Sequence, residues 1–138
     1  MYYGNAFEMF ASRAEILTMI NNILEGRAFD QLMQISLADY RASDKGKRFD
    51  APASNPDFAA LCEERDNHLR HASHHRELRY DQATGKVHYN VGKGGSGGGR
   101  EMSYAQYLTK CSRLHHQIIV LLRLHLLMAQ VGRVTYPV

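Results

Sequence analysis

The chain has no tryptophan, two cysteines and three prolines among its 138 residues. Cys62 and Cys111 lie far apart and outside any CxxC spacing, which excludes a disulfide-rich secreted scaffold and a zinc ribbon. The most apolar run, 118–128, is about half the length of a bilayer span and contains Arg123 and His125. The first residues lack the basic and apolar regions of a signal peptide. We therefore expect a cytoplasmic protein with reduced thiols and no membrane segment.

The composition is otherwise that of a soluble globular protein, with 44% hydrophobic and 22% charged residues. The length fits a single domain over residues 1–138. The net charge of +3 permits an anionic partner such as RNA without requiring one. Histidine is the unusual component: the chain has eight, and four of them are His68, His71, His74 and His75.

Apolar residues recur at helical spacing in four segments, which predicts helices over 5–24, 29–42, 56–75 and 103–130. Gly26 is a suitable end for the first helix, and Asn55 is a suitable N-cap for the third. The residues expected to point inward in the first two helices are Phe7, Phe10, Ala14 and Leu17, then Phe29, Leu32, Met33, Ile35 and Leu37.

Between the third and fourth helices, residues 77–90 have the pattern of a β-hairpin, with Gly85 available for a positive φ. The glycine-rich segment 92–99 has the composition of a flexible linker. Together these patterns predict an all-α protein: a four- to five-helix bundle with a β-hairpin and a Gly-rich loop inserted before the last helix. From Ile118 onward that helix is apolar nearly all round, which indicates a central helix or one shared with a second subunit.

The histidine-rich segment has three interpretations. Its side chains could form only a solvated, weakly basic surface. Alternatively His71 and His75, at i and i+4, could bind a metal ion, but no HExxH glutamate is present and Arg70 and Arg76 would repel a cation. Finally, an arginine and a histidine together suffice for RNA transesterification: imidazole moves the proton and guanidinium stabilises the phosphorane. We expect no metal and no cofactor.

The segment Arg65-Asp66-Asn67-His68-Leu69-Arg70-His71 resembles the R-x4–6-H signature of the HEPN superfamily, in which a polar residue usually follows the arginine. The resemblance implies an α-helical bundle with the motif on a late helix. Many members of that superfamily are metal-independent RNases of toxin–antitoxin, abortive-infection and other antiviral defence systems. In catalytic members, two subunits bring their motifs together at a dimer interface.

By this resemblance, Arg65 would carry transition-state charge, His71 would be the general acid/base and Asp66 would orient the active-site groups. In a continuous helix Arg65 and His71 would lie about 120° apart, which a helix end or a groove between two subunits would relieve. Arg70 with His75 is a competing register, but it lacks an Asn or Asp after the arginine. The residues expected to bind RNA are Asn67, His68, Arg70, His74 and His75.

We therefore expect a metal-independent endoribonuclease that acts as a homodimer through the motif helix and the C-terminal helix, with an antitoxin or another defence-system protein as a further partner. The alternative is a non-catalytic helical module for dimerisation or protein interaction, because the apolar stretch 118–128 favours either role equally.

Overall fold

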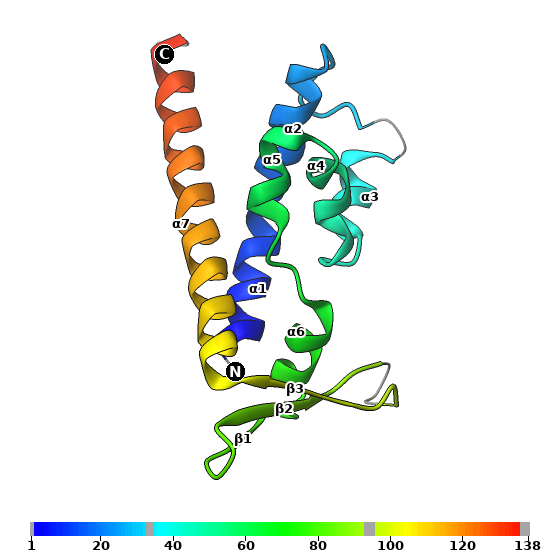
Figure 1. The fold of residues 1–138 in the computed structure, drawn as a ribbon. Coiled ribbons are helices and arrows are strands. Elements are labelled where there is room, and N and C mark those ends of the chain that lie inside the picture. Colours follow the sequence, from blue (N-terminus) through cyan, green and yellow to red (C-terminus); the bar gives the residue numbers. More distant parts are fainter. Residues whose placement is uncertain (1, 33–34, 93–95, 136–138) are drawn as a thin grey trace. The chain divides into compact units, whose positions relative to one another are not determined.

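A computed structural model describes residues 2–32, 35–92 and 96–135 (Figure 1). The chain divides into two compact units. Unit 1 contains Met1–Met9 and Glu64–His116, and unit 2 contains Phe10–Glu63 and Gln117–Val138. Each unit is therefore built from two separate parts of the chain.

Unit 1 combines helices with a small antiparallel sheet of order β1-β2-β3 (Figure 1). Its elements are the first part of α1 (Tyr2–Arg13), α6 (Asn67–His74), β1 (Arg79–Asp81), β2 (Lys86–Asn90), β3 (Gly99–Ser103) and the first part of α7 (Tyr104–Thr135). Its buried hydrophobic residues are Tyr3, Ala6, Phe7, Leu69, Ala72, Val87, Tyr89, Val91, Cys111 and Leu114.

The sheet makes the all-α prediction wrong. The hairpin of β1 and β2 forms as expected, with Gly85 at φ +66°, but β3 adds a third strand to it. Of residues 99–103, the sequence assigns only Gly99 to the linker and Ser103 to the start of the last helix. Residues 99–103 become a strand because β2 alternates buried and less buried side chains and offers β3 its second edge, from Lys86↔Ser103 to Asn90↔Gly99. The fold is therefore α-rich with a three-stranded antiparallel sheet.

Part of the glycine-rich segment forms the turn between β2 and β3. Val91 and Gly97 approach closely, with a hydrogen bond of 2.7 Å from the Gly97 N–H to the Val91 carbonyl. Gly92 has φ +85°, and a Cβ there would lie 2.7 Å from the Gly97 nitrogen. Glycine is therefore required at this position. Residues 93–95, which belong to the expected flexible linker, lie outside the described residues.

Unit 2 is built almost entirely from short helices. Its elements are the end of α1, α2 (Glu15–Leu24), α3 (Leu37–Ala42), η1 (Lys47–Phe49), α4 (Asp50–Ala53), α5 (Pro56–Ala59), η2 (Ala60–Cys62) and the second part of α7. The stacked rings of Phe10 and Phe49, whose centroids are 4.4 Å apart, lie in its core with Leu17 and Leu121.

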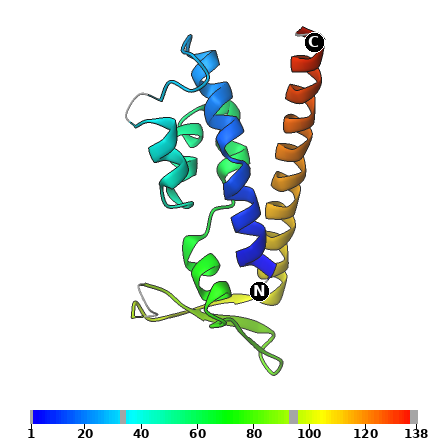
Figure 2. The same ribbon diagram turned by 180° about the vertical axis from the view of Figure 1, so that it is seen from behind.

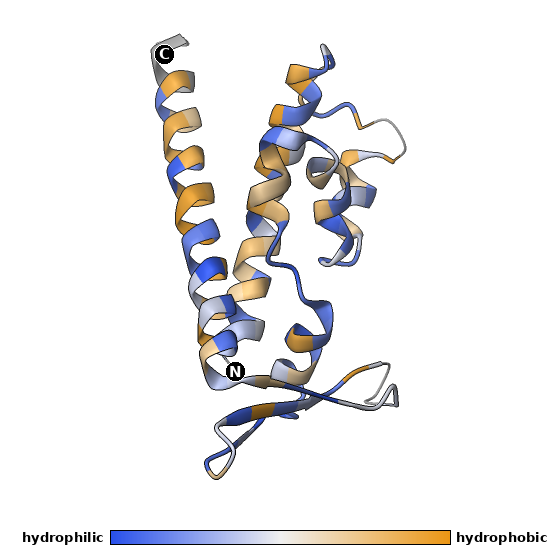
Figure 3. Ribbon diagram, viewed as in Figure 1, coloured by the Kyte–Doolittle hydropathy of each residue, from blue (hydrophilic) through white to orange (hydrophobic). Residues whose placement is uncertain are grey.

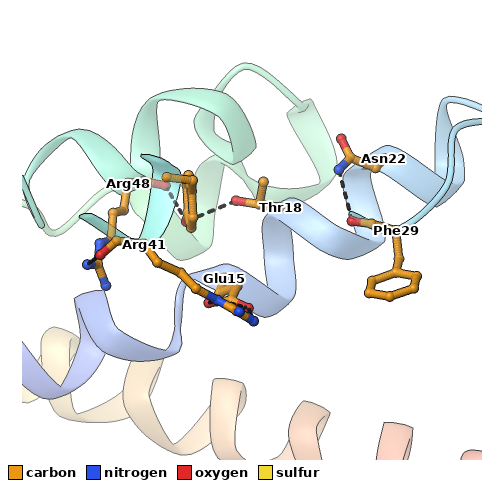
Figure 4. Close-up of polar contacts among 7 residues, drawn as sticks. Glu15, Thr18, Asn22, Phe29, Arg41 and Arg48 are labelled. Carbon is orange, nitrogen blue, oxygen red and sulfur yellow. Dashed lines mark hydrogen bonds and ion pairs between the residues drawn. The ribbon is translucent and has the colours of Figure 1, made fainter. Parts of the chain in front are cut away.

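Polar contacts fix α3 and η1 against α2 (Figure 4). The Thr18 hydroxyl donates to the Tyr40 hydroxyl at 3.1 Å, and Tyr40 donates to the Arg48 carbonyl at 3.0 Å. Arg41 Nε donates hydrogen bonds to both oxygens of the Glu15 carboxylate, at 3.0 Å to Oε2 and 3.1 Å to Oε1. This hydrogen bonding holds the pKa of Glu15 below its ordinary value.

The expected helix boundaries need correction. The helix predicted over 29–42 exists only as α3, and Phe29 and Ile35, expected inside, are exposed; Met33 lies outside the described residues. The helix predicted over 56–75 is divided into α5, η2 and α6. The helix predicted over 29–42 is shorter because Phe29 and Ile35 are not buried. The helix predicted over 56–75 is interrupted because Asp66 caps a new helix that begins at Asn67.

The last helix, α7, is long and unbroken in both views (Figure 1, Figure 2). Apolar residues recur along its second part (Figure 3). Among the described residues it is the one helix that is long and apolar enough to cross a membrane by length and composition, and 22% of its most apolar window is buried. This length differs from the expectation of no membrane segment, which considered only the apolar run 118–128. Length and composition alone are weak evidence for a membrane, and the structure is compatible with a soluble protein.

Candidate functional site

The start of α6 separates the expected catalytic residues. Asp66 is the N-cap, with extended backbone, and its Oδ1 accepts a 3.0 Å hydrogen bond from the Leu69 N–H. Arg65 therefore lies before the helix, exposed, whereas His71 is inside it and half-buried. The 120° separation expected for a continuous helix does not apply, because α6 begins only at Asn67.

A buried hydrogen-bond network holds this helix start in unit 1. The Tyr3 hydroxyl donates to Glu64 Oε1 and accepts from the Asp66 N–H, both at 3.0 Å. Lys110 donates to the same Glu64 oxygen at 3.1 Å and lies 3.6 Å from Asp66 Oδ2. Tyr3 and Glu64 are almost fully buried, at 0% and 4% exposure. The network thus fixes where α6 begins.

The surroundings of Tyr3 and Lys110 in this network shift the pKa of both groups upward. Burial, reinforced by the charge of Glu64, raises the pKa of Tyr3 well above its ordinary value, so the hydroxyl stays neutral. Burial alone would lower the pKa of Lys110, but the hydrogen bond and charge of Glu64 outweigh it and raise that pKa. Glu64 is therefore paired with one cation and one neutral donor, as a buried carboxylate requires.

The exposed face of α6 carries three of the histidines. At 100° per residue, His68, His71 and His75 fall within about 60° of arc, away from the buried side of the helix. The rings of His71 and His75 are in contact, with centroids 4.2 Å apart. Asn67 is exposed in the first turn of α6. Two adjacent imidazoles can serve as proton acceptor and proton donor for one substrate.

Arg70 and His74 lie on another side of α6 and contact α1. Arg70 Nε is 2.7 Å from Glu8 Oε1, and its guanidinium lies over the Phe7 ring at 5.3 Å. His74 Nε2 is 3.4 Å from the same Glu8 oxygen. These two expected RNA-binding residues are therefore engaged in holding α6 to α1.

The end of α6 also has a defined geometry. His75 is the C-cap, and Arg76 follows with φ +59°, in the left-handed region that usually takes glycine. The Glu77 N–H bonds to the Ala72 carbonyl at 2.8 Å and closes the helix. His75 is therefore held one turn from His71.

Charge is distributed unevenly between the two units. Unit 1 has nine Lys and Arg residues against six Asp and Glu, whereas unit 2 has eight of each. The whole net charge of +3 thus belongs to unit 1, which also contains seven of the eight histidines. An anionic ligand is attracted to that unit.

Among residues 2–32, 35–92 and 96–135, no group of three or more His, Cys, Asp or Glu side chains is placed to hold a metal ion. Of the expected residues, Arg65 lies before α6, Asp66 caps it, and Asn67, His68 and His71 lie inside it.

Sequence reasoning missed Tyr3, Glu64 and Lys110, the residues that position the helix start. Tyr3 and Glu64 are 61 residues apart, and no local spacing connects them. The one available signal was a cluster of polar residues at 63–67 within a segment read as a continuous helix.

Comparison of the chain with protein-family models, with characterised proteins and with solved structures gives no match. The functional assignment therefore depends on the residues and geometry of this chain.

Proposed function

We propose that unit 1 cleaves RNA without a metal ion, and that α6 carries the reactive groups. The observation that supports this most is the contact between the His71 and His75 rings, 4.2 Å apart on the exposed side of α6. The pair lies in the unit that carries the whole net positive charge, which favours a polyanionic substrate.

In the proposed reaction, His71 accepts the proton of a ribose 2′-hydroxyl as the 2′ oxygen forms a bond to phosphorus. The bond from phosphorus to the 5′ oxygen of the next nucleotide breaks, and protonated His75 gives its proton to that oxygen. The products are a 2′,3′-cyclic phosphate and a free 5′-hydroxyl. Arg65 stabilises the additional negative charge of the phosphorane.

Asp66 acts as a positioning residue in this proposal. Its Oδ1 caps α6 through the Leu69 N–H, and its Oδ2 lies 3.6 Å from Lys110. These contacts orient the helix that carries His71. Asn67 and His68, both exposed in the first turn, would contact the RNA backbone.

The order Arg65, Asp66 and His71 also supports membership of the HEPN superfamily and, with it, a cytoplasmic homodimer of a toxin or antiviral defence system. The three-stranded sheet of unit 1 departs from the helical bundle that this resemblance implies. The sequence motif and the chemistry of the site support the HEPN assignment, whereas the fold gives it no further support.

Cleavage of a 5′-labelled RNA in the presence of EDTA tests the proposal. We expect the wild type to cleave, and His71→Ala and Arg65→Ala to lose on the order of 100- to 10,000-fold in rate, the usual contribution of such groups. His88→Ala, which changes a histidine of β2 in the same unit, is the matched control and should retain full activity. A substrate with one 2′-deoxyribose should resist cleavage at that position.

Full activity of both variants, loss of activity in EDTA, or no cleavage by the wild type would each refute the proposal. Circular dichroism of every variant distinguishes lost chemistry from lost folding.

A second candidate is a non-catalytic interaction module, and the exposure of α7 favours it. Its second part exposes the large apolar side chains Leu122, Leu126, Leu127, Met128 and Val131. Such a surface is typical of an interface between subunits, here with a second copy of this chain. If this candidate is right, sedimentation shows a dimer that Leu126→Glu dissociates, and no RNA cleavage accompanies it.

A further inference from the structure

Four tyrosines of unit 1 come together at the start of α7, and we call them the tyrosine surface: Tyr2, Tyr80, Tyr104 and Tyr107. They belong to α1, β1 and α7. The rings of Tyr80 and Tyr104 have centroids 4.9 Å apart, and those of Tyr104 and Tyr107 are stacked at 6.4 Å with 25° between their planes. Mutual packing thus holds the rings of Tyr80, Tyr104 and Tyr107 in place.

Three of these rings are presented to solvent, and the fourth, Tyr107, is half-buried. Tyr2, Tyr80 and Tyr104 are 52%, 52% and 44% exposed. The hydroxyl of Tyr2 is hydrogen-bonded to His115 Nδ1 at 3.2 Å. Exposed aromatic rings gathered from three elements provide flat apolar faces on which another planar group can stack.

An open groove of about 430 Å³ adjoins the tyrosine surface. Its lining includes Tyr2, Tyr104, Tyr107, Leu108, Ser112 and His115. The ring faces offer stacking, and the Ser112 hydroxyl and the His115 imidazole offer hydrogen bonds at the same place. A planar heteroaromatic ligand with polar edges matches this combination.

The charge around the groove favours a ligand with an anionic backbone. None of the side chains that line it is acidic, and α7 contains no Asp or Glu over its whole length. Burial raises the pKa of Tyr107 to about 12, with Cys111 contributing, so this phenol stays uncharged near neutral pH. The unit as a whole has the excess of Lys and Arg described above.

From these observations we infer that the tyrosine surface binds the unpaired bases of a single-stranded RNA. Stacking on tyrosine faces requires bases that are not paired, whereas a duplex presents only its backbone and groove edges. The inference rests on the proposed RNA-cleaving function and specifies its substrate class: a strand with at least one unpaired stretch.

Binding of a fluorescein-labelled, 2′-O-methyl RNA 12-mer tests the inference, since this oligonucleotide has no 2′-hydroxyl to attack and cannot be cleaved. We expect Tyr104→Ala to weaken its binding by about 5- to 150-fold, the range measured for removing one stacking ring. Tyr104→Phe keeps the ring and should bind like the wild type. Phe29→Ala, an exposed aromatic residue of unit 2, is the second control.

A blunt-ended duplex of 2′-O-methyl RNA with the same sequence, which has no unpaired stretch, should bind more weakly and should respond little to Tyr104→Ala. Because the chain has no tryptophan, its intrinsic fluorescence comes from tyrosine, and bases stacked on the surface should quench it. Equal binding by wild type and Tyr104→Ala, or an equal loss for single strand and duplex, would overturn the inference.

The experiment also separates the inference from the proposed function. Cleavage that depends on His71 together with unchanged binding by Tyr104→Ala refutes the tyrosine surface alone. Binding that depends on Tyr104 without any cleavage refutes the catalytic proposal alone. If Tyr104 is instead needed for binding to phosphatidylcholine–phosphatidylserine vesicles and not to RNA, the tyrosines contact a membrane and the inference is wrong.

Discussion

Replacing Tyr3 by phenylalanine removes a single oxygen atom from the interior of unit 1, yet that oxygen takes part in two hydrogen bonds. One goes to Glu64, which is 4% exposed, and the other comes from the Asp66 N–H. A hydrogen bond to a charged group contributes about 1.5–3 kcal/mol, and the backbone bond adds about 1 kcal/mol. We therefore expect Tyr3→Phe to lower the free energy of unfolding by about 2–4 kcal/mol. Lys110 would still donate its hydrogen bond to Glu64 in this variant.

Urea unfolding followed by circular dichroism measures this loss, which should shift the midpoint without changing the slope. Tyr2→Phe is the matched control, because it makes the same change one residue away on a side chain that is 52% exposed. The control should stay within about 0.5 kcal/mol of the wild type. If the two variants unfold at the same urea concentration, the network does not hold the start of α6 as described. Hydrogen exchange of the Leu69 amide should also be faster in Tyr3→Phe, because that amide is bonded to the helix cap.

Two further changes test other contacts. Gly4→Ala places a Cβ 3.0 Å from the Ser73 hydroxyl oxygen, and the resulting crowding between α1 and α6, typically about 1–3 kcal/mol, should outweigh the gain in helix propensity of about 1 kcal/mol. Thermal unfolding should therefore show a lower Tm for this variant. Asn5→Ala, on the exposed side of α1, is the control and should not lower the Tm. Glu15→Gln tests the lowered pKa of Glu15: the carboxylate stabilises the fold above its unfolded pKa, and this contribution is lost as the pH falls through its folded pKa. The free energies of unfolding of wild type and variant should therefore differ at pH 7 and converge in acid. A difference that persists at pH 2 would contradict this explanation.

Local signals in the sequence identified several structural features correctly. Asn55 caps α5, accepting from the Asp57 N–H at 2.9 Å, and Pro56 occupies its first turn. Ser103 caps α7, with its Oγ accepting from the Gln106 N–H at 3.1 Å. Gly26 has φ +75° just after α2, as a helix end requires. In each case the deciding interactions lie within a few residues, where sequence is informative.

Features that depend on distant parts of the chain were not predicted. Strand β3 forms because β2 has a free edge, and its own sequence, Gly99 to Ser103, has little strand character. The division of the third helix depends on Asp66, whose capping conformation is supported by Tyr3, 63 residues away. The sequence predicts which residues form the motif, but it does not show the contact between His71 and His75 or the ion pair of Arg70 with Glu8, which depend on the three-dimensional structure.

Because unit 1 is formed by two separate segments of the chain, the candidate site cannot assemble as soon as α6 has been synthesised. Tyr3 precedes its partner Glu64 by 61 residues, and a further 46 residues separate Glu64 from the cation Lys110. At about 5–20 residues per second, that interval lasts about 2–9 s. During it, the start of α6 lacks its buried cation, and β3 and α7 are still incomplete. A nascent chain therefore cannot present the finished site until Lys110 has also been translated, which separates the synthesis of α6 from the assembly of the site around it.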